Sequence, residues 1–458
     1  METSSLYTAL PLAFLLLLTL KLFSSWFKQP KNLPPSPPSI PILGHLHLLK
    51  HPLHRTLHSL SQSYGPHIAY DNTMVLFASY GEQWRSLRRV CTVEMFSSAR
   101  LNSFLPDRRD EIKRLLLNLN KRASSSGDEF TKVELKPIFW EMTFNIIMRM
   151  LTGKRYYGED VTDAEEAKVF SEIMSEILEY TVSAYPGDYL SILRLFFRNY
   201  EKRVSWLSKR SDALLQNLIE ERKNSRRKRC GGESRETVLD HLLLLQEKQP
   251  EFYTDEIIKG LLLVMLIAGT DTSASTMARA MFFLLSHPHS LKRAIEELDN
   301  VIGQERLIEE TDIAKLPFLQ NIVSETLRLK PPAPLLVPHM SSEDCIIGGY
   351  DVPSQTIVFI NIWSIQRDSK LWDDPKSFRP EKFENEDDGQ CKLLSFGLGR
   401  RACPGANMAQ RVINVALGSL IQCFEWKGRS EEGMNMPKAL PLEAMYKAYE
   451  IMARIAEH

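Results

Sequence analysis

Apolar residues recur at helical spacing along most of this 458-residue chain. The spacing predicts helices over residues 134–151, 170–178 and 200–221. A longer helix is predicted from Thr254, whose hydroxyl suits an N-cap, to about residue 285. Its middle is apolar on every side, as in a helix that crosses a protein interior. The pattern therefore predicts a mainly α fold with this helix in its core.

Three shorter stretches favour β-strands. Residues 334–339 are extended and apolar, and residues 350–353 and 356–362 are rich in strand-forming side chains. They predict a small sheet beside the helices. A further helix is predicted over residues 316–329. The expected fold class is thus mainly α with a small β-sheet.

The first 44 residues differ in composition from the rest. Residues 6–27 are apolar except for Lys21, and this length can cross a bilayer. No small-residue cleavage site follows, and Lys28 and Lys31 come directly after it. We therefore expect residues 1–27 to be an uncleaved, single-pass anchor in the endoplasmic reticulum membrane, with the body of the chain in the cytosol. Proline-rich residues 28–44 are expected to form a stiff hinge.

Composition narrows the function classes. The chain carries 57 basic and 57 acidic residues, so its net charge does not indicate a nucleic-acid partner. Its six cysteines form no CxxC pair, which argues against a disulfide framework or a zinc site and favours a reducing compartment. A basic run at residues 222–233 lies beside two glycines, as in many surface loops.

One cysteine stands in a distinctive setting. Residues 396–405 read FGLGRRACPG, a glycine-rich turn that presents Cys403 just before a predicted buried helix. The helix dipole would stabilise a thiolate there, and Pro404 suits the first helical position. A thiolate in such a turn fits a metal ligand. The alternative is a buried cysteine that packs as a small hydrophobe.

Two further constellations carry polar chemistry. Trp84 and Arg88 stand four positions apart, so their N–H groups can converge on one anion; the alternative is a solvated basic helix face. Asp271 and Thr272 place an acid and a hydroxyl in the middle of the apolar helix, which predicts a proton relay because burying an unused carboxylate is costly. The alternative for Thr272 is a hydrogen bond back to the Ala268 carbonyl.

Together these features resemble the cytochrome P-450 superfamily. The loop around Cys403 is similar to its haem-binding loop, and residues 268–272 are similar to its oxygen-activating segment. The resemblance implies the cytochrome P-450 fold behind an N-terminal transmembrane anchor, with haem b (iron protoporphyrin IX) bound through Cys403. It assigns proton delivery to Asp271 and Thr272. It assigns the haem contacts to Trp84, Arg88, His339, Phe396, Gly399, Arg401, Cys403 and Gly405.

Two of the implied contacts depart from the pattern or leave an alternative. His339 resembles a propionate contact, but it can equally be an ordinary turn histidine. Glu325 and Arg328 resemble a scaffold pair that meets a later arginine in the family, where this chain has Lys382. Because lysine lacks a planar fork, we expect a weaker triad unless Arg379 reaches in.

The stretches EMTFNIIMRMLTGKRYYGED, PGDYLSILR and MPKALPLEAM resemble plant microsomal members such as isoflavone hydroxylases. The resemblance implies a monooxygenase that inserts oxygen from O₂ into a small apolar, aromatic plant metabolite of the isoflavonoid, flavonoid or phenylpropanoid type. Electrons would come from NADPH-cytochrome reductase, and the basic residues around Arg85 suit an acidic donor. The expected pocket is formed by residues 73–78, Ala268, 335–337 and 439–440.

The predicted catalytic domain, residues 45–458, departs from its relatives at one point. After Pro66 the relatives continue through two strands, a short helix and the start of a substrate loop, whereas this chain passes directly to His67. We expect several tens of residues to be missing there, which would leave unpaired strand edges and an incomplete pocket wall. Two alternatives therefore stay open: a truncated, inactive or non-catalytic membrane haem protein, and a haem-thiolate isomerase or dehydratase.

Overall fold

The computed structural model describes residues 74–125, 129–159, 161, 164–182, 198–228, 236–384, 392–428 and 443–457. The predicted anchor, the hinge and the junction between Pro66 and His67 lie outside these ranges, as do Thr73 and residues 439–440 of the expected pocket. The described residues fall into two units, a helical unit and a smaller β unit over Val337–Ile360.

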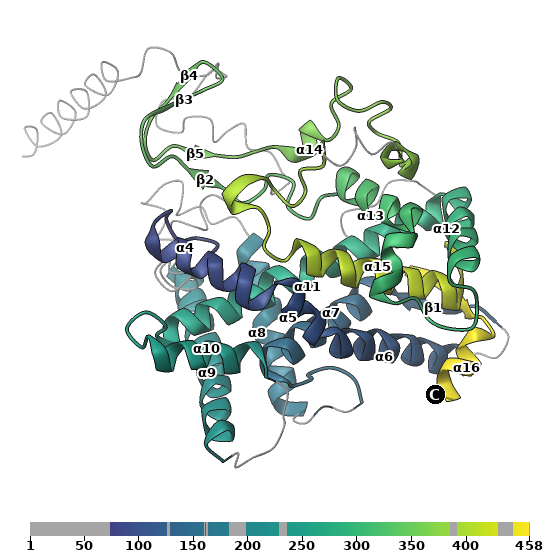
Figure 1. The fold of residues 1–458 in the computed structure, drawn as a ribbon, viewed down its shortest axis with the longest axis horizontal. Coiled ribbons are helices and arrows are strands. Elements are labelled where there is room, and N and C mark those ends of the chain that lie inside the picture. Colours follow the sequence, from purple (N-terminus) through teal and green to yellow (C-terminus); the bar gives the residue numbers. More distant parts are fainter. Residues whose placement is uncertain are drawn as a thin grey trace, which may run out of the picture. The chain divides into compact units, whose positions relative to one another are not determined.

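The helical unit contains most of the chain (Figure 1). Its elements up to the long central helix are α4 (Glu82–Arg89), the π-helix η2 (Val90–Met95), α5 (Ser98–Ser103), α6 (Leu105–Ser124), β1 (Thr131–Glu134), α7 (Leu135–Thr152), α8 (Ala164–Val182), α9 (Arg198–Lys228), α10 (Val238–Lys248) and α11 (Asp255–Ser286). They are followed by α12 (Pro288–Val301), η5 (Glu310–Lys315), α13 (Pro317–Leu329), α14 (Ile362–Ile365), η6 (Pro380–Phe383), η8 (Gly399–Arg401), α15 (Ala406–Cys423), β6 (Phe424–Gly428), β7 (Glu443–Ala448) and α16 (Ile451–Glu457).

Helix α11 is the core element of this unit, as its apolar sequence predicts. It spans 32 residues, and the Thr254 hydroxyl caps it by accepting the Ile257 N–H at 3.3 Å. It packs against α7, α15, α13 and α9. Among the described helices it alone is long and apolar enough to cross a bilayer, but most of that apolar stretch is buried by the surrounding helices. Burial on all sides accounts for its composition without a membrane.

The other predicted helices are present with shifted ends. Helices α7 and α13 begin and end within one residue of the prediction, whereas α9 continues seven residues beyond residue 221 into the basic run. The reason is pairing with carboxylates distant in sequence. Arg222 forms an ion pair with Asp240, Lys223 Nζ lies 2.9 Å from Asp255, and Arg226 also has an acidic partner. The predicted loop is therefore wrong as far as Lys228.

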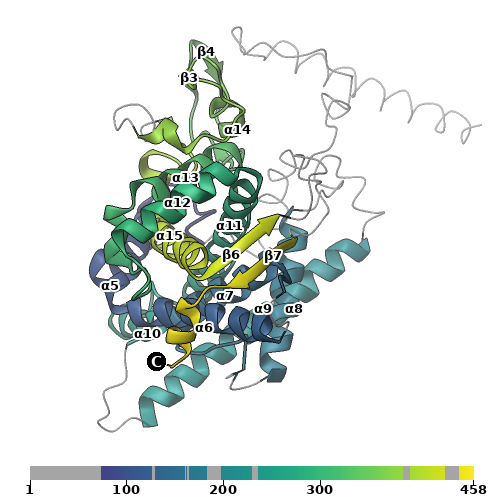
Figure 2. The same cartoon turned by 90° about the vertical axis from the view of Figure 1, so that its right-hand side faces the viewer.

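The sheets are small and antiparallel. In the helical unit β7 pairs with both β1 and β6, which gives a three-stranded sheet; Figure 2 shows β6 and β7 next to one another. Sequence patterning missed this sheet. The β unit contains the predicted strands in shorter form, with β2 (His339–Met340) paired to β5 (Ile357–Val358) and β3 (Cys345–Ile347) paired to β4 (Tyr350–Val352). Within residues 337–360 each of these strands has one partner, and Ile346 and Met340 are exposed.

A buried ion pair holds α13 to the loops that follow it. Arg328 donates to both carboxylate oxygens of Glu325 at 2.5 and 2.8 Å, and both side chains are fully buried. Lys382 Nζ lies 3.7 Å from Glu325 Oε1, and burial lowers the pKa of this lysine although Glu325 opposes the shift. Arg379 contributes its backbone N–H to Glu325 at 3.0 Å, while its side chain is directed to Asp373. The weaker lysine contact agrees with the expectation from sequence, but the Arg379 side chain does not replace it.

Replacing Arg328 with methionine should leave the Glu325 carboxylate buried and unpaired. We expect the free energy of unfolding to fall by about 3–5 kcal/mol, because one partner of a buried pair cannot be removed cheaply. Denaturant titration followed by circular dichroism measures this change. The control is Arg379→Ala, which keeps the backbone N–H and should change stability by less than about 0.5 kcal/mol. Equal losses in both variants would contradict the assigned role of the pair.

Close packing between α7 and α11 depends on Gly269. A Cβ added there would lie 2.9 Å from Ile147 Cδ1, which is closer than real contacts allow. Thr143 of α7 also donates to the Thr270 carbonyl at 3.2 Å, so the two backbones are held together beside Asp271.

A Gly269→Ala substitution should therefore interact with residue 147. Alanine stabilises the helix by about 1 kcal/mol through its propensity, but the clash with Ile147 costs a comparable free energy. The single variant should therefore have nearly the same free energy of unfolding as the wild type. Adding Ile147→Val removes Cδ1. The double variant should therefore be about 1 kcal/mol more stable than the sum of the two single changes in unfolding free energy would give. Thermal unfolding of the four proteins in a double-mutant cycle gives this coupling. Additive effects would show that the two positions do not touch.

Candidate functional site

The loop that presents Cys403 is closed by its own backbone. The Cys403 N–H donates to the Phe396 carbonyl at 2.8 Å, which folds the ends of the loop together. Gly397 and Gly399 have φ of 70° and 71°, the left-handed region that favours glycine. The following helix α15 begins at Ala406, so Cys403 precedes its first residue by three positions and Pro404 lies in the preceding turn. The expected helical position of Pro404 is thus wrong.

The surroundings of the Cys403 sulfur do not favour a thiolate. The residue is exposed, but enough protein surrounds the sulfur that burial raises the pKa of the thiol. The backbone N–H of Gly405 and the charge of Arg88 lower this pKa by less than burial raises it. The expected stabilisation of an anion by N–H groups at the helix start is thus present at Gly405, but burial outweighs it. A metal ion at the sulfur would supply the missing positive charge, because a coordinating thiol is deprotonated.

Helix α4 is joined to the cysteine loop through Arg401. The Arg401 guanidinium lies 4.7 Å from the centre of the Trp84 ring and donates to the Ala78 carbonyl at 2.9 Å. Burial lowers the pKa of Arg401. The buried Trp84 indole donates its N–H to the Val75 carbonyl at 3.1 Å. This N–H is bonded within the protein, so the expected convergence of Trp84 and Arg88 on one anion would require it to exchange partners and stays a prediction.

Two neighbours of this contact were missed from sequence. Tyr80 packs on Trp84 with ring centres 5.4 Å apart, and Arg400 lies 5.0 Å from the Tyr80 ring. The i, i+4 spacing of the two aromatic residues was a usable signal. Arg88, in contrast, makes no ion pair with a described residue and is half-buried. It is therefore a cation of this helix without an acidic partner among the described residues, as are the exposed Arg85 and Arg89.

The middle of α11 carries the predicted relay residues. The helix is buried on both sides of this turn, yet Ala268 and Thr272 are exposed. The Thr272 hydroxyl donates to the Ala268 carbonyl at 2.6 Å, which is the alternative that the sequence left open. Asp271 is 37% exposed and lies 3.1 Å from Lys136 Nζ, so it is a paired, half-buried acid and not the fully buried one expected. Nothing in the spacing of Lys136 indicated this partner.

The remaining predicted residues are distributed as follows. His339 belongs to the β unit, where it pairs with Val358, and its Nδ1 is buried without a hydrogen-bond partner among the described residues. Phe396 is half-buried against the core of the helical unit. Of the expected pocket residues, Met74 and Ala78 are buried and Leu335, Leu336 and residues 75–77 are half-buried.

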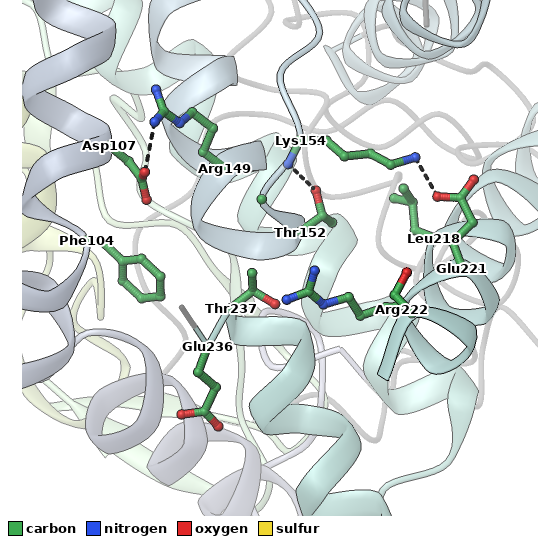
Figure 3. Close-up of a pocket in the computed structure, with 12 residues that line it drawn as sticks. Phe104, Asp107, Arg149, Thr152, Lys154, Leu218, Glu221, Arg222, Glu236 and Thr237 are labelled. Atoms are coloured by element: carbon green, nitrogen blue, oxygen red, sulfur yellow. Dashed lines mark hydrogen bonds and ion pairs between the residues drawn. The ribbon is translucent and has the colours of Figure 1, made fainter. Parts of the chain in front are cut away.

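A polar cavity of about 400 Å³ lies elsewhere in the helical unit (Figure 3). Its lining comes from the start of α6, the end of α7, α9 and the residues before α10, and it includes none of the predicted haem or relay residues. Its charged groups neutralise one another: Arg149 pairs with Asp107 at 3.0 Å, and Lys154 pairs with Glu221 at 2.5 Å. Arg222 is likewise bound to Asp240.

The cysteine loop fits a flat macrocycle that carries a metal. A Cβ added to Gly399 would meet no atom within 4 Å, so this face of the loop is open. Among the described residues no three His, Cys, Asp or Glu side chains gather as metal ligands. Cys403 is therefore a single donor, which suits an iron whose other ligands come from a porphyrin. Arg88 adds an unpaired cation near the sulfur for a carboxylate of such a group.

Comparison with known proteins agrees with this geometry. The sequence model of the Cytochrome P450 family matches residues 67–452. Isoflavone 3'-hydroxylase from Medicago truncatula is 48% identical over 497 aligned positions, covering 97% of this chain and 98% of that protein. Isoflavone 2'-hydroxylase from Glycyrrhiza echinata is 43% identical, covering 93% and 94%. A (+)-piperitol/(+)-sesamin synthase from Sesamum radiatum is 44% identical, with 99% of both chains covered.

A solved structure confirms the architecture. A zebra fish cytochrome P450 with abiraterone superposes with a TM-score of 0.66 over 86% of this chain and 92% of that one, and at 23% identity it establishes the fold alone. The family match covers most of the chain, and its near-full-length relatives are monooxygenases. Their shared sequence, the common fold and the open loop at Cys403 lead to one conclusion. This chain belongs to the cytochrome P450 family of haem-thiolate monooxygenases.

Proposed function

We propose that this enzyme hydroxylates an apolar, aromatic plant metabolite of the isoflavonoid, flavonoid or phenylpropanoid type. The observation that carries the proposal is the exposed, single Cys403 on a loop with an open face. Relatives at 43–48% identity are named for isoflavones and for the piperitol and sesamin pair, so the substrate class is supported more strongly than any one substrate.

We propose the following roles for the residues around the haem. Haem b, when bound, would supply activation of O₂ at its iron. Cys403 would hold the iron, with Phe396, Gly399 and Gly405 forming the loop around it. Arg88 would bind a propionate with its free guanidinium, and Arg401 would assist from its position on Trp84. His339 is proposed as a further propionate contact, supported by its unbonded Nδ1.

Proton supply is proposed for Thr272 and Asp271. The Thr272 hydroxyl donates its hydrogen bond to the Ala268 carbonyl, and Asp271 forms an ion pair with Lys136. The Thr272 hydroxyl and the Asp271 carboxylate therefore have to leave these partners before they can pass a proton towards the site where O₂ would bind. The exposure of Thr272 in an otherwise buried helix places that exchange beside open space.

The cellular setting follows from the segments outside the described residues. We propose a single-pass anchor at residues 1–27 and a hinge at residues 28–44, which tether the catalytic domain, residues 45–458, to the cytosolic side of the endoplasmic reticulum. The electron donor would be NADPH-cytochrome reductase, an acidic partner suited to exposed cations such as Arg85 and Arg89.

A deletion between residues 66 and 67 remains part of the proposal. The alignment to the Medicago protein has 497 positions, more than the 458 residues of this chain, so that relative contains residues without a counterpart here. The family match also begins at residue 67, directly after the proposed junction. An incomplete pocket wall would favour the second candidate, a membrane haem protein without turnover.

The haem-thiolate assignment is tested by carbon monoxide difference spectroscopy of the full-length protein. The reduced wild-type protein should show a thiolate-type Soret band, and Cys403→Ala should abolish it because alanine offers no ligand. The matched control is Cys423→Ala, at a buried cysteine away from the loop, which should keep the band. A wild-type protein that binds haem but lacks the band would refute thiolate ligation.

Turnover separates the three candidate functions. With reductase and NADPH, a panel of isoflavones, flavones and lignan precursors should yield at least one product that carries an added hydroxyl. A normal Soret band without any NADPH-dependent product would favour the non-catalytic haem protein. A peroxide substrate rearranged without NADPH would instead favour an isomerase or dehydratase.

The role of Trp84 is tested by Trp84→Phe. Phenylalanine keeps the ring under Arg401 but leaves the Val75 carbonyl without its donor, which should cost about 1 kcal/mol of stability. Haem content measured by the pyridine haemochrome assay should be unchanged, because the indole N–H is bonded within the protein. In Arg88→Met the haem content should fall. If the haem content of Trp84→Phe fell without a matching loss of stability, the result would support a direct contact between the Trp84 N–H and a haem propionate.

A further inference from the structure

The basic run at the end of α9 borders the polar cavity of the helical unit. Residues 222–228 read RKNSRRK, so five of these seven side chains are cationic. Ser225 stands in the middle of the run, is exposed and lines the cavity. Its hydroxyl makes no hydrogen bond with another described residue. The run therefore presents a free hydroxyl group in a strongly positive setting.

Lys154 is the cation of this cavity that can change partners. It follows the end of α7, and its Nζ lies 2.5 Å from Glu221 Oε2 and 3.2 Å from Glu166 Oε2. Figure 3 shows the pair with Glu221 at the cavity. Burial lowers the pKa of this lysine, but the two carboxylates raise it by more, so the lysine stays charged at neutral pH. Because its stem is flexible and it has two carboxylate partners, Lys154 can leave one of them and keep the other.

Arg222 also lines the cavity, but it is held more firmly. Its guanidinium is 13% exposed and forms an ion pair with Asp240. Thr237 donates its backbone N–H to the same carboxylate at 2.9 Å, so Asp240 belongs to the capping box that begins α10. Removing Arg222 from this pair would leave a nearly buried carboxylate without its cation, which is costly.

A phosphate on Ser225 would change the charge balance of the cavity. Three cations and three carboxylates line it and neutralise one another, whereas phosphoserine adds a charge of about −1.5 to −2. Glu221 stands four residues before Ser225, on the same face of α9, so the phosphate would repel this carboxylate and attract Lys154. The phosphate would also lie in the last turn of the helix, where the dipole disfavours an anion. A cation is therefore required to hold it.

We propose that Ser225 is a phosphorylation site and that Lys154 binds the added phosphate. A serine kinase transfers the γ-phosphoryl group of ATP to this residue. The bond between Ser225 Oγ and the γ-phosphorus forms, and the bond from that phosphorus to the bridging oxygen of ADP breaks. The hydroxyl proton passes to a base of the kinase. Lys154 then leaves Glu221 and pairs with the phosphate, while Arg222 stays on Asp240.

The sequence around Ser225 fits a kinase with an acidic substrate groove. Arg222 stands three residues before the serine, and Arg227, two residues after it, is exposed and has no ion-pair partner in the part of the chain that the structure describes. Opposite charge on the kinase would attract this run and distinguish it from serines in neutral surroundings. Helix α9 ends three residues beyond Ser225, so only its last turn has to open for the hydroxyl to enter a kinase.

The site is tested on the full-length protein with Mg²⁺, ATP and a purified arginine-directed serine kinase, and the modified residue is located by mass spectrometry. Phosphate should appear on Ser225 and should be lost from the α9 segment in Ser225→Ala. The matched control is Ser208→Ala, because this serine of α9 has no arginine three residues before it; this variant should keep the phosphate on Ser225. A standard basic peptide verifies that the kinase is active. An unmodified Ser225 with that active kinase refutes the proposed site.

The role of Lys154 is measured by phosphorus NMR of the phosphorylated protein during a pH titration. The second ionisation of phosphoserine lies at about pH 6, and a bound ammonium group should lower its midpoint by roughly half a unit. Lys154→Met should reverse most of this shift, and Lys154→Arg should preserve it. The control is Lys223→Met, because Lys223 is 31% exposed and pairs with Asp255 at 2.9 Å but does not line the cavity. The same midpoint in wild type and Lys154→Met would refute binding of the phosphate by Lys154.

Discussion

A helix that is apolar on every side has to be covered on every side, and this requirement organises the helical unit. Helix α11 meets it with α7, α15, α13 and α9 packed around it. Apart from Glu256 in its first turn, the exposed positions of the helix are Ala268 and Thr272, where polar residues interrupt the apolar sequence. The same constraint that builds the core therefore also marks the part of the helix that is available for chemistry.

The cysteine loop shows what the protein provides and what a cofactor has to add. Backbone closure between Cys403 and Phe396, together with two glycines of positive φ, presents the sulfur on an open face. The surroundings raise the thiol pKa instead of lowering it. The polypeptide thus supplies shape and access, the Gly405 N–H and Arg88 lower the thiol pKa in part, and a bound iron would add further positive charge at the sulfur. Arg401 packs on the Trp84 ring and so connects this loop to α4.

Charged residues in this protein find partners far away in the sequence. The basic run at the end of α9 pairs with carboxylates of α10 and α11, and Lys136 of α7 pairs with Asp271. Glu325 and Arg328 stand three residues apart on one helix, and the Arg328 guanidinium also donates to the carbonyls of Gln366, Pro375 and Ser377 in the loops that follow. The pairs made by α9 and by Lys136 thus join elements whose proximity depends on packing, whereas Glu325 and Arg328 share one helix.

The sequence alone determined the features that depend on local pattern. These are the positions of α7, α11 and α13, the small β unit, the loop around Cys403 and the acid and hydroxyl at residues 271 and 272. Apolar periodicity, helix caps and turn glycines act over a few residues, so they can be recognised in the sequence. Only the tertiary structure decided that Trp84 donates to Val75, that the Cys403 pKa is raised and that Lys136 holds Asp271. Those outcomes depend on which groups packing brings within a few ångströms, and no spacing along the chain encodes that distance.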